Sequence, residues 1–443
     1  MNERDLELPE GYRITDLGPL PEEWEVVRLG EVFNVQQGKQ LSSKESKDGK
    51  IKRPFLRTSN LSWGYVSISK IDEMYFTPQE YEKLRLKSGD VLVCEGGDIG
   101  RTALYRGELD ECAYQNHLHR LRPKRDNIEV EFFVFWMNHA INQRQLYTYT
   151  ANRTTIPNLS GSRLKSFIFP LPPLPEQKKI AAVLSTIQEA KERTEAVISA
   201  TRDLKKSMMK YLFTYGPVPL PEAENVPLKE TEIGMIPEEW EVVRLGDVAE
   251  KMKAGGTPRR GVDEYWGGDI PFVLIGDMTS CCLYLSKTKE TLTDTGMGNS
   301  NAWLVPPNSI LLSMYATIGE TAINTIPVAT NQAILGIVPK NSLNTVFGAY
   351  LLKHNAQRLT MQNIQSTQKN VNKGIVENFR IPLPPLPIQQ EITSILSAID
   401  EKIEAEENKK KALDDLFNTL LHDLMTAKIR VNHLDMDEIE LSV

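Results

Sequence analysis

Pro21-Glu-Glu-Trp-Glu-Val-Val-Arg-Leu-Gly30 is the stretch that decides the organisation of this chain, because the same ten residues return unchanged as Pro237–Gly246. A second run, Pro170-Leu-Pro-Pro-Leu-Pro175, returns as Pro382–Pro387. Each proline run leads into a long helical pattern. The repeats therefore predict two copies of one unit, a domain followed by a helix, joined head to tail. Such a duplication can place two similar surfaces about an approximate two-fold axis, which suits a two-fold-like partner such as duplex DNA.

Length and composition are those of a soluble globular protein. The 443 residues suffice for two or three domains, each with its own core. Hydrophobic residues make up 40% and charged residues 25%, and no run of about 18 apolar residues predicts a membrane span. Residues 1–7 lack the apolar stretch of a secretory signal, so we expect a cytoplasmic protein. The four cysteines are Cys94, Cys112, Cys281 and Cys282. Their spacing matches neither a zinc finger nor a Cys-x-x-Cys motif, so we expect reduced thiols.

The net charge of −7 is unusual for a nucleic-acid binder, so the distribution of charge matters more than its sum. Acidic residues crowd the region between the repeats and the C-terminal part of the chain. From His117 to Arg125 the chain instead reads His-Leu-His-Arg-Leu-Arg-Pro-Lys-Arg, without an acid. The balance weakens a DNA-binding hypothesis but leaves it open.

Short alternating runs separated by glycines predict a compact, mainly antiparallel sheet domain in the first half. The predicted strands are Trp24–Leu29, Phe55–Leu56, Tyr65–Ile71, Val91–Cys94, Thr102–Tyr105 and His117–Leu121. A helix is expected from about Val130 to Gln145, where apolar side chains recur at helical spacing. The second half repeats this order, with strands at Ser309–Ser313 and Thr321–Ile323 and a helix at Gly348–Leu359.

The segments after the proline runs predict two long helices, about Glu176–Phe213 and Ile388–Met425. Seam positions in both step alternately by four and three residues, with apolar ends and a more polar middle. Sustained heptads of this kind indicate a two-helix coiled coil. About 38 residues at 1.5 Å each give a rod on the order of 55 Å. Antiparallel pairing would place the two globular domains at opposite ends of this rod.

Between the halves, Gly216-Pro-Val-Pro-Leu-Pro221 and the residues up to Pro227 predict a stiff, extended linker. The expected fold class is α/β (α+β): two similar domains of mixed, mainly antiparallel sheet plus helices, joined by antiparallel coiled-coil helices with pseudo-two-fold symmetry. The expected parts are globular domain 1 (1–172), helix 1 (173–215), the linker (216–236), globular domain 2 (237–384), helix 2 (385–428) and a C-terminal tail (429–443).

The sequence offers no convincing catalytic constellation. Gly96-Gly-Asp-Ile-Gly100 lacks the lysine of a nucleotide-binding loop, and we interpret it as a turn between strands. Gly255-Gly-Thr-Pro-Arg-Arg-Gly261 lacks the strand-to-helix setting of a phosphate loop. The sequence contains no Gly-x-Ser-x-Gly elbow, no His-Glu-x-x-His and no Asn/Asp-Pro-Pro-aromatic run of adenine methyltransferases. These features favour a binding module over an enzyme.

The combination of motifs resembles the specificity subunit of a type I restriction–modification enzyme. The resemblance rests on the duplicated opening motif and on the duplicated Pro-Leu-Pro-Pro-Leu-Pro-(x)-Gln run. Further matching stretches are Gly255-Gly-Thr-Pro-Arg259, Tyr265-Trp-Gly-Gly-Asp-Ile-Pro271 and Met209–Gly216, the last of which is echoed weakly by Leu424–Val431. Each motif alone is a weak signal, but the combination is specific and covers nearly the whole chain.

This resemblance implies a division of labour. Each globular domain would be a target recognition domain that reads one half of a split, asymmetric DNA sequence. The helices would set the spacer between the half-sites and dock two modification (methyltransferase) subunits. S-adenosylmethionine and adenine methylation would belong to those subunits, whereas restriction subunits would carry out ATP-driven translocation and cleavage with Mg²⁺. This chain would hold no cofactor or metal of its own.

Basic and amide side chains are the candidate DNA contacts, because Arg and Lys suit guanine or phosphate and Asn and Gln suit adenine. In the first half they are Arg57, Arg101, His117, His119, Arg120, Arg122, Lys124, Arg125 and Arg153. In the second half they are Arg259, Arg260, Lys287, Lys289, Gln365, Gln368 and Lys369. Strand alternation places His117 and His119 on one face and Arg120 and Arg122 on the other. A solvated sheet edge is the alternative interpretation of this run.

Other prominent residues have different interpretations. Trp24 and Trp240 of the duplicated motif are expected in the core rather than as stacking platforms. The exposed flanks of the helices, including Lys178, Lys179 and Arg193, are candidates for subunit docking. Two alternatives to DNA recognition stay open. One is a coiled-coil scaffold that holds two ligand-binding domains without DNA, and the other is an enzyme such as a free-standing methyltransferase, against which the missing motifs argue.

Overall fold

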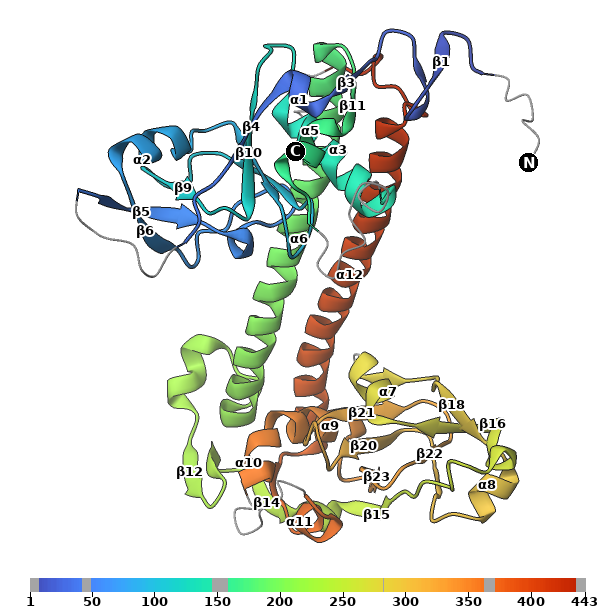
Figure 1. Ribbon diagram of the computed structural model, residues 1–443. Helices are drawn as coiled ribbons and strands as arrows, with labels where there is room; N and C mark the ends of the chain where they lie inside the picture. Colours follow the sequence, from blue (N-terminus) through green and yellow to red (C-terminus); the bar gives the residue numbers. More distant parts are fainter. Residues whose placement is uncertain (1–7, 42–48, 146–157, 282, 362–370, 436–443) are drawn as a thin grey trace. The chain divides into compact units, whose positions relative to one another are not determined.

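The computed structural model describes residues 8–41, 49–145, 158–281, 283–361 and 371–435. The chain divides into two compact units (Figure 1): a first unit of residues 1–193 and 410–443, and a second unit of residues 194–409. Two long helices, α6 (Leu174–Tyr215) and α12 (Leu386–Met425), each contribute a part to both units. Their bounds lie within two residues of the predicted ones. None of the helices in the described ranges combines the length and apolar character that a membrane crossing needs.

Two sheets form the globular part of the first unit, in the strand orders β4-β10-β7-β8 and β6-β5-β9. The strands are β4 (Phe33–Gln37), β10 (Leu118–Pro123), β7 (Asp90–Cys94), β8 (Thr102–Tyr105), β6 (Asp72–Phe76), β5 (Ile51–Leu56) and β9 (Ala113–Tyr114). Because side chains alternate between the two faces of β7, Leu92 lies in a core together with Phe55 and Tyr114 of the smaller sheet. Short helices connect the strands: α1 (Leu29–Val32), η1 (Thr58–Asn60), α2 (Pro78–Leu84) and α5 (Gly161–Ser166).

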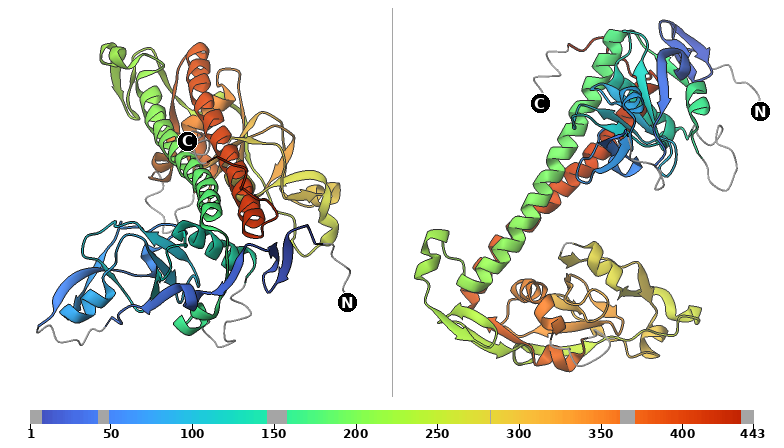
Figure 2. Two further views of the ribbon diagram at one scale, coloured as in Figure 1. Left: turned by 90° about the horizontal axis from the view of Figure 1, so that it is seen from above. Right: turned by 60° about the vertical axis from the view of Figure 1, so that its left-hand side comes forward.

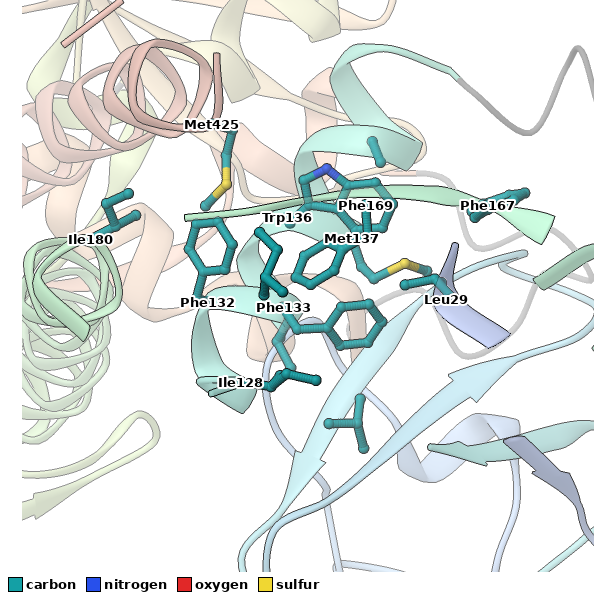
Figure 3. Packing of buried hydrophobic residues seen from close by; sticks show 14 of the residues in the cluster. Leu29, Ile128, Phe132, Phe133, Trp136, Met137, Phe167, Phe169, Ile180 and Met425 are labelled. Atoms are coloured by element: carbon teal, nitrogen blue, oxygen red, sulfur yellow. The ribbon is translucent and has the colours of Figure 1, made fainter. Parts of the chain in front are cut away.

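The opposite face of the larger sheet packs on α3 (Val130–Asn138), which a π-helical turn, η2 (His139–Gln143), continues. Phe132, Phe133 and Trp136 surround Phe169 in an aromatic cluster (Figure 3). Side chains from α6 and α12 belong to the same core, including Ile180 and Met425. Within the first unit, one core therefore joins the sheet, α3 and parts of both long helices.

The second unit repeats this arrangement with two sheets, in the orders β15-β23-β20-β21-β17 and β18-β16-β22-β19. The strands are β15 (Ala249–Ala254), β23 (Ile334–Pro339), β20 (Ser309–Ser313), β21 (Thr321–Asn324), β17 (Tyr284–Leu285), β18 (Glu290–Leu292), β16 (Trp266–Val273), β22 (Val328–Thr330) and β19 (Leu304–Val305). The helices are α9 (Thr345–His354), α10 (Ala356–Met361), α11 (Lys373–Glu377), α7 (Ile275–Ser280), α8 (Asp294–Gly298), η4 (Leu245–Val248) and η5 (Asp263–Tyr265). Phe347 of α9 packs in a core with Leu212 of α6 and Leu396 of α12.

The two repeated sequence motifs meet each other in space. β3 (Glu25–Arg28), from the opening motif, pairs antiparallel with β11 (Ile168–Leu171), from the proline run. The second unit forms the same pair from β14 (Glu241–Arg244) and β24 (Arg380–Leu383). Trp24 and Trp240 are buried next to these pairs, which confirms their predicted place in the core. Each pair closes a globular domain directly before its long helix begins.

Hairpins precede both opening motifs. β1 (Tyr12–Thr15) pairs with β2 (Gly18–Pro21), and β12 (Leu228–Thr231) pairs with β13 (Gly234–Pro237). In each turn the threonine hydroxyl donates to the glycine carbonyl at 2.7 Å. The predicted extended linker is therefore wrong from Leu220 on, because η3 (Leu220–Asn225) is a 3-10 helix and the hairpin follows it. The prolines of this segment alone predicted an extended chain. Hydrogen bonds within the turns instead fold the segment into a 3-10 helix and a hairpin.

Two other sequence predictions need correction. Tyr65–Ile71 forms no strand, because Asn60 donates through its side-chain amide to the carbonyls of Ser67 (3.1 Å) and Lys70 (2.8 Å) and so occupies backbone groups that a ladder would use. The predicted helix at Gly348–Leu359 is two helices, α9 and α10, which Asn355 separates.

A buried glutamine ties each globular domain to the start of its long helix. Gln177 donates through Nε2 to the carbonyls of Asn127 (2.9 Å) and Pro172 (2.7 Å), and its Oε1 accepts from the backbone N–H of Glu129 (2.9 Å). Gln389 repeats all three bonds in the second unit with Ser342, Pro384 and Asn344. Both side chains are fully buried. We call these two sets of bonds the glutamine bridges, which hold the first turns of α3 and α9 against the long helices.

Within each unit, α6 and α12 pack antiparallel (Figure 2). The start of α6 meets the end of α12 in the first unit, and the end of α6 meets the start of α12 in the second. Ion pairs between the helices follow the same register, with 2.6 Å between Lys191 and Asp414 and 2.6 Å between Lys205 and Asp400. The predicted antiparallel pairing of the two long helices is confirmed.

Replacing Gln177 with Leu is expected to lower the free energy of unfolding by about 2–4 kcal/mol, because two buried carbonyls and one N–H lose their partner. Gln389→Leu should cost a similar amount, since its bonds are the same. Gln188→Leu on a partly exposed face of α6 is the control, with an expected change of about 0.5 kcal/mol or less. Urea unfolding measures all three. A change for Gln177→Leu as small as that of the control would contradict the role of the bridge.

Candidate functional site

The strand register of the first unit brings three loops to one edge of the larger sheet. β10 pairs antiparallel with both neighbours, so Gln37 at the end of β4 lies opposite His119, and Cys94 at the end of β7 lies opposite Leu118. The loops 38–41, 95–101 and 115–117 therefore meet where β10 begins. The backbone N–H of Leu159 donates to the carbonyl of Glu95 at 2.8 Å and brings a fourth segment to this place. We call it the loop edge of the first unit.

The second unit has a counterpart of this edge. The ends of β15 and β20 flank the start of β23, so the loops 255–260, 314–320 and 331–333 meet there. Gly38 and Gly255 occupy corresponding places, because a Cβ atom at either would lie within 2.2 Å of the backbone carbonyl oxygen of Gln115 or Thr330. Only glycine permits this close approach of two loops. Val371 hydrogen-bonds the backbone of Met314, as Leu159 does with Glu95.

Amide and hydroxyl side chains gather at both loop edges. Gln37 is exposed and donates to Glu95 Oε2 at 2.8 Å and to the carbonyl of Asn116 at 3.0 Å. In the second unit, Thr257 Oγ1 donates to Gln332 Oε1 at 2.7 Å. These residues were not among the predicted DNA contacts, because the predictions in the first half rested on positive charge. The amide-rich runs Gln36-Gln-Gly-Lys-Gln40 and Gln115-Asn116 were the signal that could have found them.

The basic run at β10 does not form one patch. His117 is exposed at the loop edge, whereas Lys124 and Arg125 lie beyond the other end of the strand, roughly 20 Å away at strand spacing. His119 and Arg120 are buried. Arg120 donates to two backbone carbonyls near α2, those of Lys83 (3.1 Å) and Arg85 (3.2 Å).

His119 combines burial with polar neighbours. Its Nε2 lies 3.1 Å from the carbonyl of Leu159 and 3.8 Å from Glu95 Oε2. Burial lowers the pKa of His119, and the carboxylate of Glu95 only partly opposes this effect. The side chain is therefore a packed, neutral element under the loop edge in this structure, and its proposed DNA contact stays a prediction.

Most of the other predicted arginines in the first unit are ion-paired. Arg57 pairs with Asp72, and Arg101 pairs with Asp98 while donating to the carbonyl of Thr58 at 2.8 Å. This last bond brings the turn that follows Arg57 next to the loop of Arg101. At the far end of β10, Arg122 donates to the buried Asp90, whose carboxylate raises its pKa. At the same end, Lys124 donates a hydrogen bond to the Gly30 carbonyl at 2.6 Å, and Arg125 forms an ion pair with Glu25 at 3.5 Å.

In the second unit, Arg259 and Arg260 follow the loop edge directly. Arg260 pairs with Glu290 at 2.6 Å and stacks its guanidinium on Trp266, 4.2 Å from the ring centre. Lys289 lines the same shallow pocket of about 400 Å³. Arg259, Lys287 and Lys289 are exposed. The pocket thus combines a stacked arginine with one exposed lysine, Lys289, an arrangement suited to an anionic or planar ligand.

Some predicted residues lie outside the described residues: Arg153, Gln365, Gln368 and Lys369. The candidates for subunit docking are all on α6. Lys178 is exposed, Lys179 donates to the carbonyl of Asn432 at 3.0 Å, and Arg193 lies 3.4 Å from Glu189. In the part of the chain that the structure describes, no group of three or more His, Cys, Asp or Glu side chains is placed to hold a metal ion. The duplicated loop edges offer hydrogen-bond donors and acceptors suited to binding.

Comparison with known proteins finds the same motif pattern twice. The family model described as type I restriction modification DNA specificity domain matches residues 21–200 and again residues 237–415. The putative type I restriction enzyme MjaX specificity subunit of Methanocaldococcus jannaschii is 30% identical over 429 residues, 95% of this chain and 97% of the relative. The MjaIX specificity subunit of the same organism is 34% identical over 186 residues, 41% of this chain and 42% of the relative.

Solved structures share the fold. One comes from work on complex assembly and conformational transition of the type I R-M system, with a TM-score of 0.57, 20% identity and coverage of 93% of this chain and 99% of that chain. Another is the type I restriction-modification system S subunit from M. genitalium, with a TM-score of 0.57, 16% identity and coverage of 90% and 96%. At these identities the likeness concerns the fold alone.

His119→Gln is expected to reduce the dependence of stability on pH. Because the folded-state pKa of His119 is lowered, the unfolded chain binds a proton at a higher pH than the folded chain does. This histidine therefore lowers the free energy of unfolding as the pH falls through the ordinary histidine value of about 6.5. Between about pH 7.5 and 5.5, the wild type should lose more stability than His119→Gln in urea unfolding.

The exposed neighbour His117 supplies the control for this experiment. His117→Gln makes the same substitution at an exposed position, and its urea unfolding is followed over the same pH range for comparison. Equal pH slopes for His119→Gln and the wild type would show that the buried ring does not stay neutral.

Proposed function

Because this chain belongs to the family of type I restriction–modification DNA specificity subunits, we propose that each of its two globular domains reads one half of a split, asymmetric DNA sequence. Its role in such a system is that of a non-catalytic DNA-recognition subunit. The duplicated loop edge is the observation that carries the proposal. The same three loops, fixed by the same glycine contact, occur in both matched repeats, while their exposed side chains differ.

The side chains at the loop edges suit base recognition. Gln37 and Asn116 in the first unit, and Gln332 in the second, carry amides that can pair with adenine. Arg101 and Arg259 lie on the loops that form the two loop edges, and would add contacts to guanine or to phosphate. Each well-placed bidentate contact discriminates between bases by roughly 1–3 kcal/mol. Different side chains on the same loop frame would let the two domains read different half-sites.

The ion pairs at the surface are compatible with DNA binding despite the negative net charge. An exposed pair such as Arg260–Glu290 contributes only about 0–1 kcal/mol to stability, so a DNA phosphate can replace the carboxylate at little cost. In the absence of DNA, the carboxylate of Glu290 holds the guanidinium of Arg260 in place. The proposed affinity depends on released counterions and should fall as salt concentration rises.

The paired helices would set the spacer between the half-sites and dock the partners. The proposed partners are two modification subunits, which would carry S-adenosylmethionine, and restriction subunits, which would carry ATP and Mg²⁺. Lys178, Lys179 and Arg193 on α6 are the proposed docking positions. An assembly of this kind acts on chromosomal DNA, so we place the protein in the cytoplasm.

Variants at one loop edge should change one half of the recognised sequence only. One double variant, Gln37→Ala with Asn116→Ala, removes amide side chains from the first loop edge. The other, Thr257→Val with Gln332→Ala, removes the hydroxyl and amide groups that pair at the second loop edge. Together with its modification subunit, each variant should methylate the wild-type site about 10- to 100-fold more slowly, because the contacts to one half-site are lost. Methylome sequencing of a host that expresses each variant identifies the half affected.

Two controls accompany this experiment. Lys411→Ala on an exposed face of α12 should leave the methylated sequence unchanged, and the chain without its modification subunit should transfer no methyl group. If variants of one edge altered both half-sites equally, or neither, the assignment of one half-site to each edge would be wrong.

Shortening both helices should shorten the spacer without altering the half-sites. Deleting residues 195–201 and 404–410 removes one heptad from each helix at paired positions, because Lys191 faces Asp414 and Lys205 faces Asp400. A heptad rises about 10 Å, which corresponds to roughly three base pairs. The methylated sequence should then carry a shorter spacer between unchanged halves. Deletion of the heptad from α6 alone breaks the pairing and should abolish methylation.

A further inference from the structure

Three polar side chains lie together at the loop edge of the first unit: Gln37, Glu95 and His119. Gln37 ends β4 and lies opposite His119 of β10, while Glu95 directly follows β7. The side-chain amide of Gln37 donates through Nε2 to Glu95 Oε2 at 2.8 Å, and His119 Nε2 lies 3.8 Å from the same oxygen. We call these three residues the polar set.

The strand register identifies the corresponding positions in the second unit. Ala254 of β15 lies opposite Leu335 of β23, at the places of the glutamine and the histidine. Met314 directly follows β20, at the place of the glutamate, and its backbone hydrogen-bonds the two neighbouring segments in the same way. All three residues are apolar and belong to one core or pack against it. The same frame therefore carries a polar set in the first unit and an apolar set in the second.

The polar set does not serve the stability of this frame. His119 is 1% exposed, and its Nδ1 has no hydrogen-bond partner among the residues that the structure describes. A buried polar group without a partner costs about 1–3 kcal/mol. The second unit shows that the same strands pack without polar residues at these positions. A local feature that lowers stability, in a fold that does not require it, is expected at functional sites.

Hydrogen bonds within the polar set leave one carboxylate oxygen of Glu95 without a partner. Gln37 Nε2 donates to two acceptors, Glu95 Oε2 and the carbonyl of Asn116 at 3.0 Å, so both hydrogens of this amide are used within the protein. None of the described residues donates to Glu95 Oε1, and the side chain of Glu95 keeps 15% of its surface exposed. The loop edge thus presents a hydrogen-bond acceptor that Gln37 holds in place.

The chemistry of a carboxylate restricts the base that it can contact. In the major groove guanine presents the acceptors N7 and O6, and thymine presents the acceptor O4, all of which repel a carboxylate oxygen. Adenine presents an amino group next to the acceptor N7, whereas cytosine presents its N4 amino group without an acceptor beside it on the same base. A carboxylate therefore favours cytosine. Because DNA phosphates repel it, it contributes to discrimination rather than to affinity.

We infer that Glu95 determines one base pair of the half-site read by the first unit, by accepting a hydrogen bond from the N4 amino group of a cytosine. Gln37 holds the other carboxylate oxygen during this contact. The second unit makes no such contact at the corresponding position, because Met314 is buried and apolar. This contact rests on the function proposed above, since it requires DNA at the loop edge.

Replacing Glu95 with Gln tests the contact. The amide keeps the shape of the side chain, but it can donate to guanine or thymine as well as accept from cytosine. Together with its modification subunit, the full-length variant should accept other base pairs at one position of one half-site, where the wild type requires a C·G pair. Discrimination at that position should fall about 10-fold or more. Methylome sequencing identifies the position, and methylation rates on duplexes that differ only there measure the change.

Two further variants serve as controls. Glu22→Gln makes the same substitution at an exposed residue in the turn before β3, and should leave every letter of the methylated sequence unchanged. The triple variant Gln37→Ala, Glu95→Met and His119→Leu introduces the side chains that the second unit carries at these positions. Its urea midpoint should equal or exceed that of the wild type, because a buried nitrogen without a partner is removed. The same variant should nevertheless lose the requirement for cytosine.

The outcomes separate this contact from the function on which it rests. The inference is overturned if Glu95→Gln keeps all letters of the wild-type sequence, or if the letter that changes is not a C·G pair in the wild type. It is also overturned if the triple variant loses stability and keeps the wild-type letters, because the polar set would then serve the fold alone. In each case a split site methylated with the wild-type chain leaves the proposed function intact. If the wild-type chain and its modification subunit methylate no split site, both proposals fail together.

Discussion

The glutamine bridge is the constraint on which the remaining geometry of each unit depends. A long helix and a sheet domain make mostly apolar contact, and apolar contact alone leaves their relative position poorly defined. Gln177 and Gln389 remove that freedom, because each satisfies three backbone groups that burial would otherwise leave without partners. They fix the start of α3 or α9, which in turn sets the sheet and its loop edge. The loops need no rigidity of their own when the frame beneath them is fixed.

The paired helices show a similar preference for defined geometry over maximum burial. Lys191 and Lys205 occupy seam positions where leucine would bury more apolar surface. Each instead meets an aspartate of the opposite helix at 2.6 Å and the face of an aromatic ring. A polar residue at a seam position specifies the register and the direction of pairing, because a shifted or parallel pair would leave it without its partner. A spacer of defined length requires this kind of specification.

The helices and the core of this protein could be predicted from the repeats and the spacing of apolar residues in its sequence. The roles of its surface side chains could not, because they depend on contacts with residues far away in the sequence. The two long helices were predicted within two residues, since their heptads extend over ten turns, and the burial of Trp24 and Trp240 followed from their duplicated motif. Alternation along β10 could not show that another loop covers His119 or that the carbonyls after α2 bind Arg120. Tyr65–Ile71 has a strand-like sequence, but the side chain of Asn60, which gave no signal in advance, occupies its carbonyls.

A duplicated unit can differ between its copies only where its frame does not depend on the residues that change. The opening motif, the proline run and the bridging glutamine make the same backbone contacts in both units, and each of these contacts fixes a segment end. Phe135 of α3 and Tyr350 of α9 lie at corresponding positions, six residues beyond the bridge, and differ in chemistry although both helices begin at the same contact. The loop edges differ for the same reason, since Gly38 and Gly255 fix the backbone there independently of the neighbouring side chains. Repetition of the frame thus permits two unlike surfaces, which is what recognition of an asymmetric target requires.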